Sequence, residues 1–325
     1  MTSTYQAAFS TFRKAGYSEN AATEMMRKSV RLANDARESF ICKNPVEIVK
    51  VALSLGPFGA TLSPPQEFAG NYPPPYGPMG HSERDDIYNT FRMKDTESEK
   101  KSIEALARFH LERLLVFARD LETWGMIDII AFETVPLVRE AFAIRKAMLD
   151  LKSTLAAEGV DFVPKPWWIS FVLPGGKSPQ KTSEGQLKTV QDIFHTTFLE
   201  KMMSDDEREL PRPTGIGINC TAPEFIAALV HDYTRALESL NILGSSRPWL
   251  ILYPDAGDTY DIMTRSWSVA PRDVKNSWAV VLKNAIHMAQ TEQQDLWAGF
   301  VLGGCCRTDP NLIQRLREQI ISPGG

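Results

Sequence analysis

Short apolar runs alternate with longer amphipathic stretches along the whole chain. The apolar runs predict six strands, at residues 46–55, 127–134, 167–173, 215–220, 249–253 and 297–304. Helical spacing of apolar residues predicts helices at 18–40, 97–124, 136–158, 184–203, 223–240, 277–290 and 311–321. Because the strands are apolar on both faces and alternate with helices, the pattern indicates an α/β protein with a parallel sheet.

Chemically distinctive residues stand where the predicted strands end. They are Gly56, Glu133, Cys220, Asp255, Cys305 and Cys306. In a (β/α) barrel the carboxyl ends of all strands face one mouth, where active sites lie. One mouth would gather these residues, so we favour a (β/α)8 barrel over an open sheet. A dinucleotide-binding fold is less favoured, since no Gly-x-Gly-x-x-Gly follows an early strand.

The number of strands falls short of a closed barrel. Six are predicted, residues 1–9 could supply at most the end of a seventh, and a barrel of this type needs eight. We therefore expect a single barrel domain over residues 1–325 that lacks its start and has about six to seven βα units. Residues 61–96 form an irregular, proline-rich insertion. A loop of this length is either a lid or binding loop, or a passive surface insertion.

Composition narrows the possible partners. The 325 residues include 36 basic and 40 acidic side chains with no basic block, so binding to nucleic acid or anionic membranes is not expected. No apolar run approaches the roughly 18 residues that a membrane helix needs. The first residues show no secretory signal, and four cysteines are few for a disulfide framework. We expect a cytoplasmic protein with free thiols or a metal.

Three cysteines follow the ends of two predicted strands. Cys220 ends one apolar strand, and Cys305 and Cys306 follow another after a Gly303-Gly304 break. Together they could hold Zn²⁺ in tetrahedral geometry and leave one position open for a soft ligand such as a substrate thiol. Zinc would lower the pKa of that thiol. Alternatively, these cysteines only pack in the core.

Two other strand-end residues also allow a purely structural interpretation. Glu133 could contact a ligand at the mouth, or it could cap the helix that follows it. Asp255-Ala256-Gly257-Asp258 could belong to the site, or it could be only a turn. Residue type and position alone leave both questions open.

Several motifs carry a resemblance to a known family. The segments Gly217-Ile218-Asn219-Cys220 and Gly303-Gly304-Cys305-Cys306-Arg307-Thr308 resemble those of the homocysteine S-methyltransferase family. Further matches follow in the family's order at residues 4–6, 56–60, 70–72, 132–136 and 253–261, with Trp267. The chain is most similar to the branch that uses S-methylmethionine or S-adenosylmethionine, rather than the branch that uses betaine.

The resemblance implies both an activity and a set of site residues. It implies zinc held by Cys220, Cys305 and Cys306, which are also the catalytic candidates, and homocysteine bound through its sulfur. Glu133 would lie near the amino group, and the site would be lined by Asn219 and the loop that starts at Gly56. Further substrate-binding candidates are Tyr5, Gln6 and Asp255. A sulfonium donor would transfer its methyl group to the homocysteine thiol, giving methionine. The oligomeric state is not predicted.

The resemblance also identifies a departure at the amino terminus. Family members begin with a strand that carries an Asp-Gly-Gly-type motif, then a helix and a second strand that ends near Thr-Tyr-Gln. Here Met1 stands just before Thr4-Tyr5-Gln6, in agreement with the strand count. One rival function is a non-catalytic family member that keeps the zinc site and serves in binding or regulation. A vicinal-thiol redox protein is a weaker rival, because the cysteines are spread over two strand ends.

Overall fold

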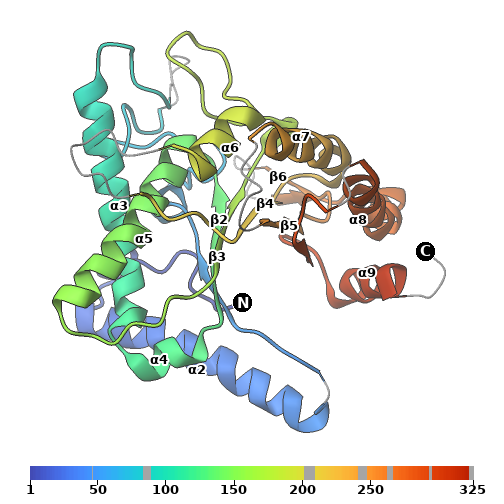
Figure 1. Cartoon of the computed structure of the whole chain (residues 1–325), viewed down its shortest axis with the longest axis horizontal. Coiled ribbons are helices and arrows are strands. Elements are labelled where there is room, and N and C mark those ends of the chain that lie inside the picture. Colours follow the sequence, from blue (N-terminus) through green and yellow to red (C-terminus); the bar gives the residue numbers. More distant parts are fainter. Residues whose placement is uncertain are drawn as a thin grey trace.

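A parallel sheet surrounded by helices forms the centre of the computed structural model (Figure 1). The structure describes residues 1–45, 47–82, 89–200, 209–240, 247–261, 266–292 and 295–321. The sheet strands are β1 (Ala52–Leu55), β2 (Ile129–Val135), β3 (Trp167–Phe171), β4 (Gly215–Asn219), β5 (Trp249–Tyr253) and β8 (Gly299–Leu302). The sheet order is β1-β2-β3-β4-β5-β8, and every neighbouring pair is parallel. The predicted α/β class with a parallel sheet is therefore confirmed.

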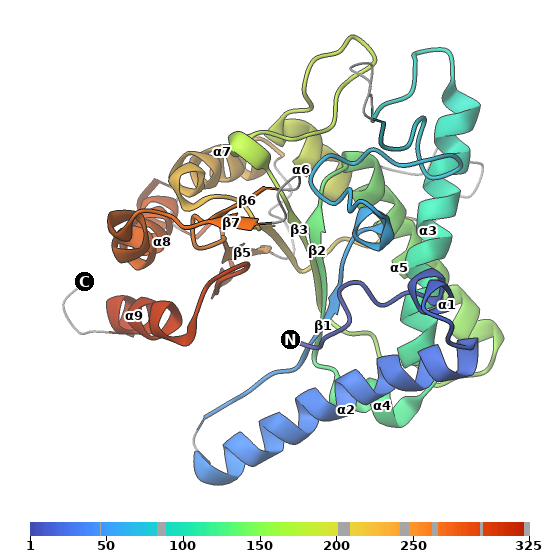
Figure 2. The same ribbon diagram turned by 180° about the vertical axis from the view of Figure 1, so that it is seen from behind.

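Helices follow the strands around the outside of this sheet (Figures 1 and 2). They are α1 (Phe9–Lys14), α2 (Glu19–Lys43), α3 (Thr96–Ala118), α4 (Leu121–Met126), α5 (Val138–Ala157), α6 (Val190–Phe198), α7 (Ile226–Ser239), α8 (Arg272–Glu292) and α9 (Pro310–Ile321). Short 3₁₀ turns occur at η1 (Phe58–Thr61), η2 (Pro174–Gly176) and η3 (Pro223–Phe225). A small antiparallel pair, β6 (Thr259–Asp261) and β7 (Ser266–Ser268), lies outside the main sheet.

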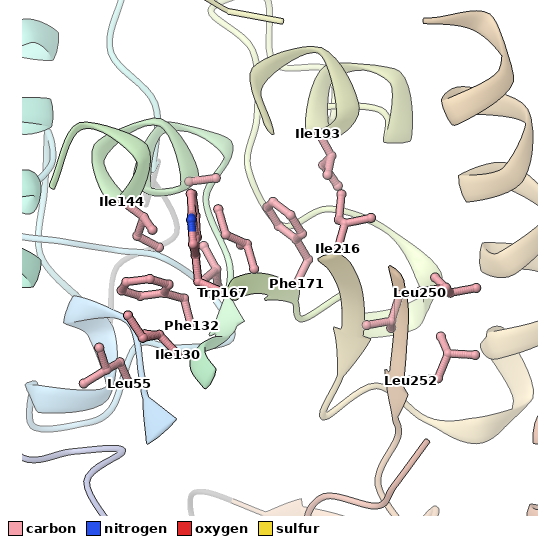
Figure 3. Packing of buried hydrophobic residues seen from close by; sticks show 14 of the residues in the cluster. Leu55, Ile130, Phe132, Ile144, Trp167, Phe171, Ile193, Ile216, Leu250 and Leu252 are labelled. Atoms are coloured by element: carbon pink, nitrogen blue, oxygen red, sulfur yellow. The ribbon is translucent and has the colours of Figure 1, made fainter. Parts of the chain in front are cut away.

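The two faces of the sheet carry different side chains. Alternate residues such as Phe132, Ile216 and Leu250 point to the outer face and pack with the helices in the main hydrophobic cluster (Figure 3). The residues between them point to the inner face, where Ala131, Trp168 and Tyr253 belong to a separate, smaller cluster. Apolar residues therefore pack the outer face against the helices, and the inner face carries a mixture of apolar and polar side chains.

The free edge of β1 is covered by the first residues of the chain. Thr2 N donates to Ala52 O at 2.9 Å, and Gly56 N donates to Tyr5 O at 3.0 Å. Between these two bonds, threonine hydroxyls rather than backbone groups form hydrogen bonds with the backbone of β1. Thr4 Oγ1 donates to Ser54 O at 2.6 Å, and Ser54 N donates to Thr2 Oγ1 at 3.0 Å. Residues 2–5 thus follow the edge of β1 without forming a regular strand.

The opposite edge of the sheet is less covered. Among the described strands, β8 pairs only with β5, and Val301 on β8 is 36% exposed. Helix α9 also leaves Ile313 and Ile321 exposed. The six predicted strands are thus described, and β1 and β8 are the two edges of the sheet. The barrel with about six to seven βα units stays a prediction.

The observed elements differ from the predicted ones mainly at their ends. The predicted helix at 97–124 is two helices, because the Asp120 side chain accepts a hydrogen bond from Thr123 N and starts α4. Helix α6 begins at Val190 rather than near residue 184, since Thr189 and Asp192 form a capping box there. Residues 201–203, the predicted end of that helix, lie outside the described part of the chain. Strand β1 is shorter than predicted, and the β6–β7 pair was not predicted.

None of the helices in the described ranges is both long and apolar enough to cross a membrane.

Candidate functional site

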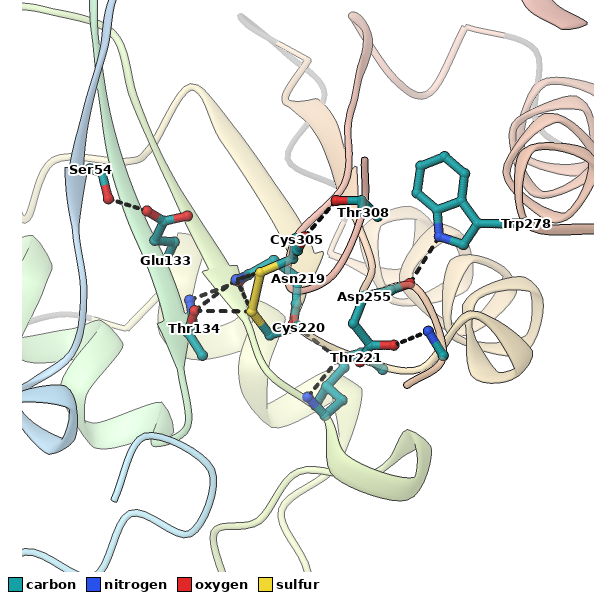
Figure 4. Close-up of a disulfide and its surroundings, with 12 residues drawn as sticks. Ser54, Glu133, Thr134, Asn219, Cys220, Thr221, Asp255, Trp278, Cys305 and Thr308 are labelled. Atoms are coloured by element: carbon teal, nitrogen blue, oxygen red, sulfur yellow. Dashed lines mark hydrogen bonds between the residues drawn. A yellow bond between two sulfur atoms is a disulfide. The ribbon is translucent and has the colours of Figure 1, made fainter. Parts of the chain in front are cut away.

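Three sulfur atoms meet where β4 and β8 end. The Sγ atoms of Cys220, Cys305 and Cys306 all lie within 4.8 Å of one another. Cys220 is buried, Cys305 is partly buried and Cys306 is exposed. The structure records Cys220 and Cys305 as a disulfide, so this bond joins the two strand ends rather than the adjacent cysteines (Figure 4). The fourth cysteine, Cys42, is exposed near the end of α2.

The loop that carries Cys305 and Cys306 is held against the end of β5. Gly303 N donates to Leu252 O at 2.9 Å, and Cys305 N donates to Pro254 O at 2.9 Å. Ala256 N donates in turn to Cys306 O at 3.0 Å. These bonds continue the β5–β8 pairing beyond β8, which places the two cysteines beside the end of β4.

A buried amide links Cys220 to the end of strand β2, across the intervening strand β3. The Asn219 side chain accepts a bond from Thr134 N and donates one to Thr134 Oγ1, both at 2.7 Å. The same Asn219 nitrogen lies 3.3 Å from Cys220 Sγ and 3.9 Å from Cys305 Sγ (Figure 4). Asn219 is fully buried, so its donors and acceptor depend on these partners. It therefore fixes the position of the sulfurs relative to β2.

The backbone is strained at two positions of this link. Thr134 has a φ of 60° and Cys220 a φ of 47°. The left-handed region is unfavourable for residues other than glycine, above all for a β-branched one, and costs about 1–3 kcal/mol each. The contacts of Asn219 with both residues help to hold them in this conformation.

Glu133 lies on the inner face beside the thiol cluster. Its carboxylate accepts a hydrogen bond from Ser54 Oγ, and the residue is only 8% exposed. Burial raises the pKa of Glu133, while its contacts with Ser54, Tyr253, the chain's amino group and Arg113 act in the opposite direction. Arg113 does not form an ion pair with Glu133, because its guanidinium donates to carbonyl oxygens.

Arg113 secures the start of the chain next to the site. The guanidinium is fully buried and donates to Gly56 O at 2.6 Å and to Tyr5 O at 2.8 Å. A side chain on Gly56 would come within 2.6 Å of the Tyr5 ring, so only glycine allows Tyr5 to lie there. Burial raises the pKa of Tyr5 well above its usual value, as do Glu67, Glu133 and Cys306, whereas a hydrogen bond with Thr134 lowers it. Tyr5 is therefore close enough to Glu133 and Cys306 for their charges to act on its hydroxyl.

Two other candidate residues are placed differently. Gln6 is exposed, and its backbone oxygen accepts a bond from Thr11. Asp255 is partly buried and accepts a bond from Gly257 N at 2.8 Å, which makes it part of the turn after β5. Burial raises the pKa of Asp255, with nearby Asp258 and Glu224 adding to the effect. The Asp255 carboxylate also lies close enough to Cys306 to influence its thiol, so the turn and the site share this residue.

The thiol cluster stands in acidic surroundings. Partial enclosure raises the pKa of Cys306, and Asp255, Glu67 and Glu133 raise it further. Residue Glu67, in the irregular insertion, has a buried carboxylate oxygen with no hydrogen-bond partner among the described residues. Local negative charge of this kind attracts cationic ligands.

Thr134, Ser54 and Glu67 were not predicted as site residues. Thr134 follows Glu133 directly in the sequence, but its contact with Asn219 depends on the pairing of distant strands. Ser54 is a polar residue in an apolar run, and this is the one sequence signal that could have identified it.

The arrangement can support two kinds of chemistry. Three converging sulfurs, two of them on the loop that follows Gly303 and Gly304, match the donor set of a zinc site with one open position. The same sulfurs can form a disulfide, which is the state that the structure records. Disulfide and zinc thiolate are mutually exclusive states of Cys220 and Cys305.

Comparisons with known proteins agree on one family. The family model described as homocysteine S-methyltransferase matches residues 1–320. A selenocysteine Se-methyltransferase from Brassica oleracea var. italica is 28% identical over 99% of this chain and 74% of its own length. The homocysteine S-methyltransferase YbgG of Bacillus subtilis is 27% identical over 97% of this chain and 77% of its own.

A solved structure gives a match at the level of the fold. The homocysteine methyltransferase MmuM from Escherichia coli, in its metallated form, is similar with a TM-score of 0.55 and 24% identity. The match covers 98% of this chain and 78% of the MmuM chain.

Proposed function

Because the chain belongs to the homocysteine S-methyltransferase family, we propose that it transfers a methyl group from a sulfonium donor to the thiol of homocysteine in a zinc-dependent reaction. The donor would be S-methylmethionine or S-adenosylmethionine, and the product methionine. The observation that carries the proposal is the convergence of three sulfurs within 4.8 Å of one another at the ends of β4 and β8.

Cys220, Cys305 and Cys306 are the proposed zinc ligands in their reduced state. Three thiolates leave one tetrahedral position for the homocysteine sulfur, and MmuM is a family relative with a metallated form. When bound, zinc would supply the Lewis acidity that lowers the pKa of the homocysteine thiol. Asn219 would steady the thiolates, because its amide nitrogen points at two of the three sulfurs.

The other residues would bind and orient the two substrates. The Glu133 carboxylate is proposed to accept a hydrogen bond from the amino group of homocysteine, since it is buried beside the sulfurs. In the transfer, the bond between the methyl carbon and the donor sulfur breaks as the homocysteine sulfur forms its bond to that carbon. The donor leaves as a neutral thioether, so the reaction depends on aligning two sulfurs with the carbon.

A methyl donor with a net positive charge is complementary to the acidic side chains around the site. Glu67, Glu133 and Asp255 all act on Cys306, and each raises the pKa of its thiol. S-methylmethionine carries a net positive charge at neutral pH, whereas betaine carries none. Substrate attraction by these carboxylates therefore favours the sulfonium branch.

The strand arrangement supports a barrel opened between β1 and β8. Six parallel strands stand in sequential order, and one continuous apolar cluster joins their outer faces to the helices. A doubly wound sheet would have helices on both faces. We retain the (β/α) barrel as a single domain and a cytoplasmic location, where free thiols persist, as parts of the proposal.

Zinc content tests the ligand set. Reduced protein loaded with zinc and desalted should hold about one zinc per chain by atomic absorption, and Cys220→Ser should hold almost none. Cys42→Ser is the matched control, because that thiol is exposed elsewhere, and it should keep the metal. Stoichiometric zinc in Cys220→Ser would overturn the ligand assignment.

A methionine assay tests the activity. The reduced, zinc-loaded protein should convert homocysteine and S-methylmethionine to methionine, and betaine should not replace the donor. Zinc binding without methionine formation from either sulfonium would instead indicate a non-catalytic binding protein.

A further inference from the structure

Buried polar groups lie together on the inner face of the sheet, on strands β3 and β5. Ser170 and Trp168 on β3 and Tyr253 on β5 alternate with residues of the outer apolar cluster, so their side chains point inward. Ser170 is fully buried, and Trp168 and Tyr253 are each 7% exposed. They lie in the part of the sheet that leads to the thiol cluster, because Tyr253 pairs in register with Asn219.

These three side chains have unused hydrogen-bonding groups. The Tyr253 hydroxyl, the Ser170 hydroxyl and the Trp168 indole nitrogen are all buried without a hydrogen-bond partner of normal geometry in the described part of the chain. Leaving such a group unpaired costs about 1–3 kcal/mol. Three of them at one place indicate a common purpose rather than three independent defects.

Glycines on the intervening strand allow the groups to approach one another. Strand β4 lies between β3 and β5 and has Gly217 at the level of Ser170 and Ile251. A Cβ atom on Gly217 would stand 2.7 Å from Ser170 Oγ and 2.4 Å from Ile251 O. At the level of Ser170, β4 therefore has no side chain on the inner face, and the next inward residue of β4 is Asn219, level with Tyr253.

The Tyr253 hydroxyl responds to Glu133 as well as to its β3 neighbours. Burial raises the pKa of Tyr253 well above its usual value, and the nearby Glu133 carboxylate raises it further. Ser170 and Trp168 act in the opposite direction, as donors to the phenol oxygen do. The Tyr253 hydroxyl therefore lies near the Glu133, Ser170 and Trp168 side chains without a hydrogen bond of normal geometry to any of them.

We propose that Tyr253 is a positioning residue that directs the Glu133 carboxylate toward the amino group of homocysteine. The Tyr253 O–H donates to one carboxylate oxygen when substrate is bound, while Ser170 and Trp168 donate to the phenol oxygen. Ser54 donates to the carboxylate from β1, so Glu133 is held from both sides. This inference rests on the proposed function, because it assumes that Glu133 contacts homocysteine.

Tyr253→Phe tests the inference in the zinc-loaded protein. We expect the KM for homocysteine to rise about tenfold, as for a lost hydrogen bond to a charged group, with kcat nearly unchanged. Zinc content should stay at the wild-type level. Tyr233→Phe is the matched control, because Tyr233 is equally buried, but its hydroxyl bonds to Gly217 O at 3.4 Å from helix α7. That control should leave the KM unchanged.

A double-mutant cycle shows whether Tyr253 acts through Glu133. Once Glu133→Gln has removed the charge, adding Tyr253→Phe should change the dissociation constant for homocysteine, measured by calorimetry without donor, less than twofold. Full additivity of the two substitutions, or an unchanged KM in Tyr253→Phe, would overturn the positioning role and leave the proposed function intact. A zinc-loaded wild type that fails to bind homocysteine would overturn both.

Discussion

The two ends of the sheet differ in how firmly they are held. At the β1 end, residues 2–5 cover the edge strand and every residue of β1 is buried. At the other end, β8 has no described partner beyond β5, and none of its four residues is buried. The thiol cluster joins the buried centre of the sheet to this exposed edge, because Cys220 directly follows the buried strand β4, and Cys305 and Cys306 follow β8. The proposed metal site therefore takes one ligand from the buried part of the sheet and two from the less covered edge.

The three cysteines are therefore held by two separate sets of hydrogen bonds, one at the end of β4 and one on the loop after β8. On the buried side, two bonds of 2.7 Å join Asn219 to Thr134, and the Asn219 amide nitrogen lies 3.3 Å from Cys220 Sγ. On the edge side, backbone bonds to Leu252 and Pro254 and the Thr308 hydroxyl hold the cysteine loop. The described residues of β8 are at most partly buried against the main apolar cluster, so the position of the cysteine loop depends more on local hydrogen bonding.

The largest expected effect is on packing at the centre of the sheet, compared with packing at its β8 edge. Phe171 on β3 is 1% exposed, and Phe171→Ala should lower the free energy of unfolding by about 3–5 kcal/mol. Phe300 on β8 contacts the same cluster but is only partly buried, so Phe300→Ala should cost about 1–2 kcal/mol. Urea denaturation of the reduced proteins measures both. Equal losses would show that β8 is packed as firmly as the central strands.

A second pair of substitutions compares the supports of the thiol cluster. Asn219→Ala should lower zinc affinity by about 10–100-fold and stability by about 1–3 kcal/mol, because it leaves Thr134 N without its partner. Thr308→Ala removes one hydroxyl from Cys305 O on the edge side and should have a smaller effect on both. Competition with a chromophoric chelator gives the affinities. A larger effect from Thr308→Ala would place the main support at the edge.

The same contrast separates what the sequence could predict from what it could not. The strands that bear Ile216 and Leu250 were predictable, because an apolar run between helices has few alternatives to a covered parallel strand. The meeting of Cys220 with Cys305 was also expected, since parallel strands end on one side of a sheet. The Asn219–Thr134 link was not, because it depends on the register and on a positive φ that only the folded surroundings impose.

The sequence predicts the start of a helix best where a capping side chain bonds to the backbone only a few residues away. Ser18 begins the helix predicted over 18–40, and its side chain accepts a hydrogen bond from Ala21 N at 3.2 Å at the start of α2. Asp120 forms the same kind of cap in the middle of an amphipathic stretch, where helical periodicity continued across it. The threonine hydroxyls that complete the β1 edge have no such signal, because their partners lie about 50 residues away.

The smallest expected effect concerns acid stability at the edge. The carboxylate of Asp258 accepts a bond from Ala270 N and pairs with Lys275 at 3.0 Å and Arg307 at 3.1 Å, next to the cysteine loop. Burial alone would raise the pKa of Asp258, but these donors outweigh it and lower the pKa. The carboxylate therefore adds stability above its unfolded pKa near 3.8, and this stability is lost as the pH falls through the lower folded pKa.

Melting temperatures between pH 6 and pH 3 test this sign. Asp258→Asn should melt below the wild type above about pH 4, and the difference should shrink as the pH falls further. Glu112→Gln is a control of opposite sign, because burial raises the pKa of Glu112 on α3 and its ionised form is disfavoured on folding. That variant should match or exceed the wild type at pH 6. A gap for Asp258→Asn that stays constant down to pH 3 would mean that the two cations do not depend on its charge, and that the cysteine loop is held by its backbone bonds alone.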